Sequence, residues 1–155
     1  MHFFTRISAQ RRNTLNRTSD VVHSLVSWLD RSVGSIKSVA ISPDGKIIAS
    51  GGNNAGDNGV FNSPIKLWDV NTGRAIPTLI EQSGTVYSVA FSPNSKILAS
   101  GDDENKIKIW NVKTGELIQT LEHYGKVNSV IFSPDGKTLV SGSDDATIKI
   151  WHIDY

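Results

Sequence analysis

The chain has 155 residues, with 16 Lys and Arg against 15 Asp and Glu, so its formal net charge is +1. This length allows a hydrophobic core without disulfides or metals. The absence of cysteine excludes a disulfide framework, a thiolate metal site and a cysteine nucleophile. No apolar run approaches the ~20 residues that span a bilayer, and the charge does not favour nucleic acid or a membrane surface as partner.

Residues 1–20 form a basic segment. Arg6, Arg11, Arg12 and Arg17, with no acidic residue, give residues 1–19 a charge of +4 and leave −3 for the rest of the chain. The segment lacks the apolar stretch of a secretory signal, so a cytoplasmic location is expected. We expect a disordered arm or a remnant of a gene boundary, with an organelle transit peptide as the alternative.

Residues 21–155 contain an internal repeat of about 41 residues. Ser42-Pro43, Ser92-Pro93 and Ser133-Pro134 each follow an apolar run and precede a polar turn. The repeat units cover about residues 34–80, 84–122 and 125–155, and their tryptophans are Trp68, Trp110 and Trp151. The first unit carries eight extra residues within 53–63. The third unit lacks the fourth apolar run that the others have, whereas residues 24–30 resemble such a run placed before the first unit.

Each run alternates β-branched or aromatic residues with small or polar ones and ends at a turn dipeptide, as in Asp44-Gly45 and Thr114-Gly115. This pattern predicts four short antiparallel strands in each unit, and no segment has the pattern of a long helix. The sequence GKVNSVIFSPDGKTLVSGSDDATIKIW resembles the WD-repeat β-propeller family, and the resemblance covers about residues 24–153. It implies an all-β fold of four-stranded antiparallel meanders, the propeller blades, with three units in an incomplete ring.

The family stiffens each blade with a hydrogen-bonded set of His, Ser, Asp and Trp. The resemblance assigns this structural tetrad to His123, Ser141, Asp145 and Trp151 in the third unit. The other units match it only in part, at Ser50 and Trp68 and at Ser100 and Trp110, since Gln82 and Glu104 replace the His and Asp of the second unit. We therefore expect apolar packing to hold those blades, through residues such as Val39, Ile41, Ile48, Val89, Phe91 and Leu98.

Several motifs have a second interpretation. Ser141, His123 and Asp145 are the residue types of a catalytic triad, but Ser141 lies within an apolar strand, so the sequence favours a blade scaffold and no enzymatic activity. The acidic run Asp102-Asp103-Glu104 and the pair Asp144-Asp145 lack the spacing of a calcium loop and are expected to be solvated turns. No histidine spacing indicates a metal site, and no cofactor is expected.

Candidate binding residues lie in loops at one face of the predicted arc. The resemblance implies that this face and the central channel bind peptide segments of other proteins. The candidates are Asn53, Asn54, Asp57, Phe61, Tyr87 and Tyr124. Phe61 is an apolar anchor for a partner in this interpretation, and the alternative is that it packs its own loop down.

The sequence thus predicts a noncatalytic scaffold for protein–protein interaction. The alternative is the C-terminal remnant of a multidomain enzyme or signalling ATPase. Three units are fewer than the 4 to 8 blades typical of closed propellers. The chain is therefore expected to be a fragment of a longer propeller protein, a ring of several copies, or an arc stabilised by a partner. Protein or peptide partners are expected, and a homo-oligomer that completes the ring is one of them.

Overall fold

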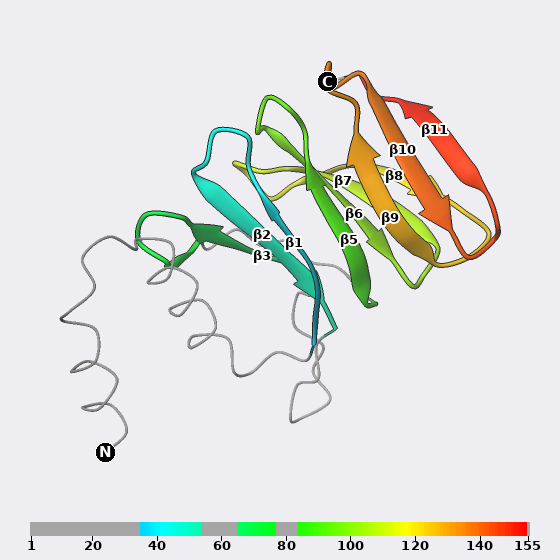
Figure 1. The fold of residues 1–155 in the computed structure, drawn as a ribbon, viewed down its shortest axis with the longest axis horizontal. Coiled ribbons are helices and arrows are strands. Elements are labelled where there is room, and N and C mark those ends of the chain that lie inside the picture. Colours follow the sequence, from blue (N-terminus) through cyan, green and yellow to red (C-terminus); the bar gives the residue numbers. More distant parts are fainter. Residues whose placement is uncertain (1–34, 54–64, 77–83, 155) are drawn as a thin grey trace, which may run out of the picture.

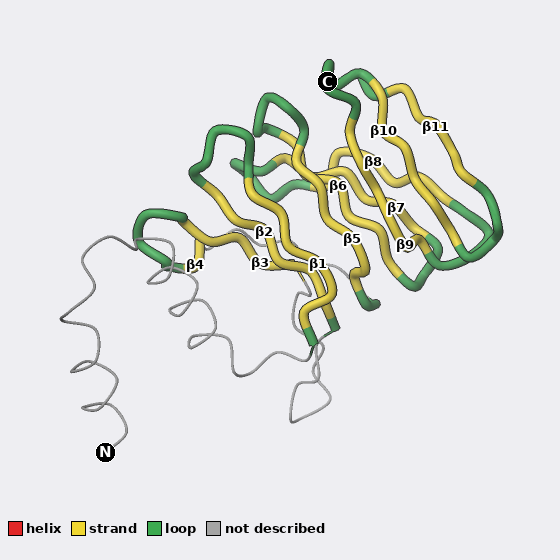
Figure 2. Tube along the Cα trace, in the orientation of Figure 1, coloured by secondary structure: helices red, strands yellow, loops and turns green. Residues whose placement is uncertain are grey.

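The computed structural model describes residues 35–53, 65–76 and 84–154. These residues form strands β1 to β11 joined by turns, with no helix among them (Figure 2). The described part of the chain therefore contains no helix that could cross a membrane. The predicted basic arm (1–20), the predicted extra strand (24–30) and most of the first-unit insertion lie outside the described residues.

The strands form three separate antiparallel sheets in chain order, which are the blades. Blade 1 contains β1 (Ile36–Ile41), β2 (Ile47–Gly52), β3 (Ile65–Asp69) and β4 (Ala75–Ile76). Blade 2 contains β5 (Val86–Phe91), β6 (Ile97–Asp102), β7 (Lys106–Asn111) and β8 (Leu117–Glu122). Blade 3 contains β9 (Val127–Phe132), β10 (Thr138–Ser143) and β11 (Ile148–His152). The predicted all-β fold of antiparallel meanders is confirmed.

The three blades stack face to face in an open arc (Figure 1). Each pair of neighbouring blades encloses one apolar layer. The layer between blades 1 and 2 contains Ala49, Ile65, Leu67, Val86, Val89, Phe91, Leu98, Trp110 and Val112. The layer between blades 2 and 3 contains Ile97, Ala99, Ile107, Ile109, Val127, Val130, Phe132, Leu139 and Ile153. A blade face is thus buried against the neighbouring blade rather than against a central core.

The Ser-Pro turn fixes the link between the first two strands of each blade. In blade 1, the Ser42 hydroxyl donates to Asp44 Oδ1 at 2.6 Å and accepts the Ile47 N–H at 2.9 Å. Gly45 takes a left-handed φ of 71° in this turn. Blades 2 and 3 repeat the hydroxyl contacts through Ser92 and Asn94 and through Ser133 and Asp135. The same local chemistry therefore sets the register of all three blades.

Val39 and Ile41 of blade 1 do not pack in an apolar layer as the sequence predicted, although Ala49, Ile65 and Leu67 of the same blade do. Val89, Phe91 and Leu98 are buried, whereas Val39 and Ile41 are 68% and 60% exposed. The prediction for Val39 and Ile41 was wrong because their face of β1 points away from blade 2. Among the described residues, no blade precedes blade 1 to cover it.

Candidate functional site

A tryptophan–serine hydrogen bond recurs in every blade. The tryptophan is on the third strand, and its indole N–H donates to the hydroxyl of a serine on the second strand. The three pairs are Trp68–Ser50 at 3.2 Å, Trp110–Ser100 at 2.9 Å and Trp151–Ser141 at 2.8 Å. Each pair gives a buried indole N–H the acceptor that it needs.

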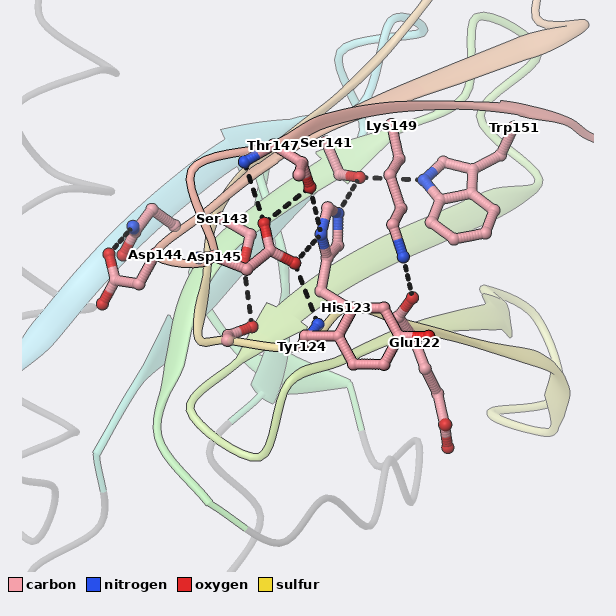
Figure 3. A network of polar contacts seen from close by, with 12 residues as sticks. Glu122, His123, Tyr124, Ser141, Ser143, Asp144, Asp145, Thr147, Lys149 and Trp151 are labelled. Atoms are coloured by element: carbon pink, nitrogen blue, oxygen red, sulfur yellow. Dashed lines mark hydrogen bonds and ion pairs between the residues drawn. The ribbon is translucent and has the colours of Figure 1, made fainter.

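In blade 3 the pair continues into a longer network (Figure 3). His123 Nε2 lies 2.7 Å from Ser141 Oγ, and His123 Nδ1 lies 2.9 Å from Asp145 Oδ2. Because a carboxylate only accepts, Nδ1 carries the proton and Nε2 accepts the Ser141 hydroxyl. The donors therefore run in one direction, from Trp151 through Ser141 and His123 to Asp145. The His123 ring also meets Trp151 edge to face, with centroids 6.0 Å apart.

Asp145 also organises the turn between β10 and β11. Its carboxylate accepts the hydroxyl and the backbone N–H of Thr147, the backbone N–H of Tyr124 and the ring Nδ1–H of His123. These donors, the Thr147 hydroxyl first, hold the pKa of Asp145 well below its ordinary value of 3.8. The carboxylate is therefore ionised at neutral pH and joins the β8–β9 connection to the β10–β11 turn.

Gly125 allows these two loops to approach each other. A Cβ at this position would stand 2.7 Å from the backbone nitrogen of Asp145. Any larger residue would push the His123 loop away from Asp145. The glycine therefore belongs to the network although it donates no side chain to it.

The contacts of Ser141, His123 and Asp145 have the distances of a catalytic triad, but Ser141 is not open to a substrate. Ser141 is 1% exposed and His123 is 4% exposed. Ser141 lies on the central strand of blade 3, paired with Val130 on one side and Lys149 on the other. Its oxygen already accepts the Trp151 N–H and donates to His123. The arrangement joins strands, as expected of a blade scaffold.

Blade 2 replaces part of this network with a buried carboxylate. Asp102 is fully buried, and its Oδ1 accepts the N–H groups of Glu104 at 3.0 Å and Lys106 at 2.9 Å. Lys108 Nζ lies 4.0 Å from the other carboxylate oxygen. The prediction of a solvated turn was therefore wrong for Asp102. Side chains alternate between the two sides of a strand, so Asp102 lies on the same side of β6 as Ser100, two residues before it. This alternation was the sequence signal for the burial of Asp102.

Two tyrosines, two lysines and an aspartate lie at one end of blades 2 and 3, where Tyr124 and Asp144 are exposed and the other three are half-buried. Tyr124 is 91% exposed, and Lys149 Nζ lies 5.1 Å from the centre of its ring. Lys126 Nζ lies 4.4 Å from the ring centre of Tyr87 and 3.4 Å from Asp144 Oδ2. We call Tyr87, Lys126, Asp144, Tyr124 and Lys149 the tyrosine row.

The tyrosine row is attached to the buried network. The Tyr124 N–H donates to Asp145 at 2.9 Å, and Lys149 Nζ donates to the Glu122 carbonyl at 2.9 Å (Figure 3). The Tyr124 backbone is therefore held in place while its side chain remains exposed. Lys149 thus makes a specific contact with the end of β8.

Of the remaining predicted binding residues, Asn53 is the one that lies within the described part of the chain. Asn53 follows β2, where its side-chain carbonyl accepts the Ser35 hydroxyl at 3.0 Å. Asn54, Asp57 and Phe61 lie outside the described residues. Within the described residues, no group of three or more His, Asp or Glu side chains could hold a metal ion.

Meandering blades stacked around an arc define the chain as part of a β-propeller. The family model for the WD domain, G-beta repeat, matches residues 20–60, 73–111 and 115–152. The chain belongs to this WD40 family, which confirms the resemblance seen in the sequence. A search of curated proteins found no match.

The solved structures that are similar to this chain include the following two. The structure of U3-55K has a TM-score of 0.64 and 28% sequence identity, and the alignment covers 77% of this chain and 36% of that one. The crystal structure of RRP9 WD40 repeats has a TM-score of 0.65 and 29% identity, with the same coverage of 77% and 36%. This chain therefore spans about a third of the length of these propeller proteins.

Proposed function

We propose that this chain is a noncatalytic module that binds a peptide segment of another protein, and that the tyrosine row is its contact surface. The observation that carries the proposal is Tyr124, which is 91% exposed although its backbone is fixed by Asp145. Exposed aromatic rings on a rigid backbone lose little conformational entropy on binding and supply most of the energy of many interfaces.

The chemistry of the tyrosine row favours a peptide that carries an apolar side chain next to an acidic one. The tyrosine rings suit an aromatic or aliphatic side chain of the peptide. The lysine ammonium groups, which the rings already orient, suit an adjacent acidic side chain. Asp144, which Lys126 and Asn128 contact, would accept a backbone or basic donor of the peptide. The WD40 family is a family of interaction domains, and its fold is generally noncatalytic, which supports this assignment.

A peptide-display experiment tests this proposal. A random peptide library is selected on the full chain, and the selected peptides are measured against Tyr124→Ala, Tyr87→Ala and the control Ile118→Ala, an exposed apolar residue of β8. We expect either tyrosine variant to weaken binding about tenfold or more, about 1.4 kcal/mol, while Ile118→Ala leaves it unchanged. Peptides that bind the tyrosine variants as tightly as the original chain would refute the assignment.

A further inference from the structure

The two internal blade interfaces follow one rule. A glycine on the second strand of the earlier blade receives a valine from the first strand of the later blade. A Cβ on Gly51 would stand 2.6 Å from Val86 Cγ1, and a Cβ on Gly101 would stand 2.6 Å from Val127 Cγ1. The glycines are therefore required by the neighbouring blade and not by their own strand.

A hydrogen bond between blades follows the same rule. The Val89 N–H donates to Ser38 Oγ at 3.1 Å, and the Val130 N–H donates to Ser88 Oγ at 3.1 Å. Each serine belongs to the first strand of the earlier blade, and each amide belongs to the first strand of the later one. The two interfaces therefore share polar as well as apolar contacts.

Blade 3 presents the earlier-blade half of this interface, and no blade within the described residues covers it. Gly142 occupies the position of Gly51 and Gly101, and a Cβ there would meet nothing within 4 Å. Ile148 and Ile150 occupy the positions of the buried Ile107 and Ile109 but are 76% and 67% exposed. Ser129, at the position of Ser38 and Ser88, is exposed as well.

Blade 1 presents the later-blade half of the same interface. Ile36, Val39 and Ile41 are 47%, 68% and 60% exposed, and they occupy the positions of Val86, Val89 and Phe91. The Val39 amide occupies the position of the two valine amides that donate to serine. The open face of blade 1 is thus the counterpart of the open face of blade 3.

The side-chain sizes on the two open faces differ from the internal ones in a complementary way. Blade 3 carries Ile131 and Val140, where blades 1 and 2 carry alanine at both positions. Blade 1 carries the smaller Ile41 where the other blades carry Phe91 and Phe132, which pack against those alanines. The open face of blade 3 therefore carries larger side chains than its internal counterparts, and the open face of blade 1 carries a smaller one.

We propose that a second copy of this chain completes the interface, with blade 3 of one copy stacked on blade 1 of the other. Ile36 of one copy then covers Gly142 of its partner, and the Val39 amide donates to the partner's Ser129 hydroxyl. Two copies satisfy both open faces in a head-to-tail ring of six blades, within the range that propellers adopt. The assignment is independent of the peptide surface proposed above, because the tyrosine row lies at the end of the blades rather than on their open faces.

Light scattering on the full chain measures the expected dimer directly. The dimer has twice the 16.9 kDa mass of one chain. Gly142→Leu fills the space that Ile36 would occupy, and a Cβ at this position meets nothing within 4 Å in a single chain. Val39→Lys places a charge on the other open face at a site that is exposed in a single chain. Both variants should therefore fold, as circular dichroism can verify, and both should have the mass of one chain.

Matched substitutions outside both faces serve as controls. Thr120→Leu and Ile118→Lys make comparable changes at exposed positions of β8 and should leave the dimer mass unchanged. An equimolar mixture of Gly142→Leu and Val39→Lys regains one intact interface and should therefore form a dimer, although neither variant does so alone.

Three results would overturn the proposal. The first is a folded chain that has the mass of a monomer at every concentration. The second is a dimer that survives Gly142→Leu or Val39→Lys, because that dimer uses another surface. The third is a mixture of the two variants that remains monomeric, because head-to-tail contact requires the mixture to associate.

Discussion

His123 Nε2 lies 2.7 Å from Ser141 Oγ in the interior of blade 3, where His123 is 4% exposed and Ser141 is 1% exposed. This contact connects the loop before β9 to the central strand β10. The imidazole thereby satisfies one polar group on each of its sides, Ser141 and Asp145, in a place with little access to solvent.

Replacement of His123 by alanine should therefore destabilise the chain. We expect a loss of about 1–3 kcal/mol in the free energy of unfolding, because Ser141 and Asp145 each lose one hydrogen-bond partner in the interior of the blade. Chemical denaturation followed by tryptophan fluorescence measures this loss. His152→Ala is the control, since His152 is exposed on β11 and should change stability by less than about 0.5 kcal/mol. Equal losses for the two histidines would contradict the structural role of His123.

Stability should fall in acid through Asp145. Its pKa lies below 3.8 in the folded chain, so its contribution to stability is complete above pH 3.8 and decreases as the pH falls towards the folded-state pKa. The difference in stability between the original chain and Asp145→Asn should therefore narrow below about pH 4. Urea denaturation at a series of pH values measures it, and two curves that stay parallel down to about pH 2 would rule out this contribution.

Asp102→Ala should cost more stability than Glu104→Ala. Asp102 is fully buried and accepts two backbone N–H groups, so its removal leaves both donors without this acceptor and a space in the interior, at about 1–3 kcal/mol. Glu104 is exposed, and water can replace its contacts. Thermal unfolding of the two variants side by side tests the difference. A larger loss for Glu104→Ala would show that the turn depends on the exposed acid instead.

Ala146→Gly should stabilise the chain. Ala146 has a φ of 65°, a left-handed conformation that glycine adopts without steric cost and alanine does not. A gain of up to about 1 kcal/mol is expected, and a higher melting temperature would reveal it. The same exchange at Ala75, an exposed strand residue without a left-handed φ, should lower stability instead. A loss at both positions would contradict the conformational argument.

The repeat register was sufficient to predict the strands and the order of the meanders, because turn chemistry such as that of Ser42 and Asp44 is local to each unit. It did not predict that Val39 and Ile41 are exposed. Burial of a blade face depends on the adjacent blade, and a strand carries the same alternation whether or not its neighbour is present. Tyr87 and Tyr124 were among the candidate binding residues, but the sequence could not predict which lysines pack on their rings, since the contact of Lys126 with Tyr87 joins residues of two different blades.

The sharing of each apolar layer by two blades also has a kinetic consequence. Blade 2 alone among the described blades has both faces covered, and the central strand β6 is buried along its whole length. In a linear array of units coupled only to their neighbours, local opening starts at the uncovered ends and reaches the middle last. In a single chain, amide hydrogens of β6 should therefore exchange with deuterium more slowly than those of β2 or β10, so that protection rises towards the centre of the arc.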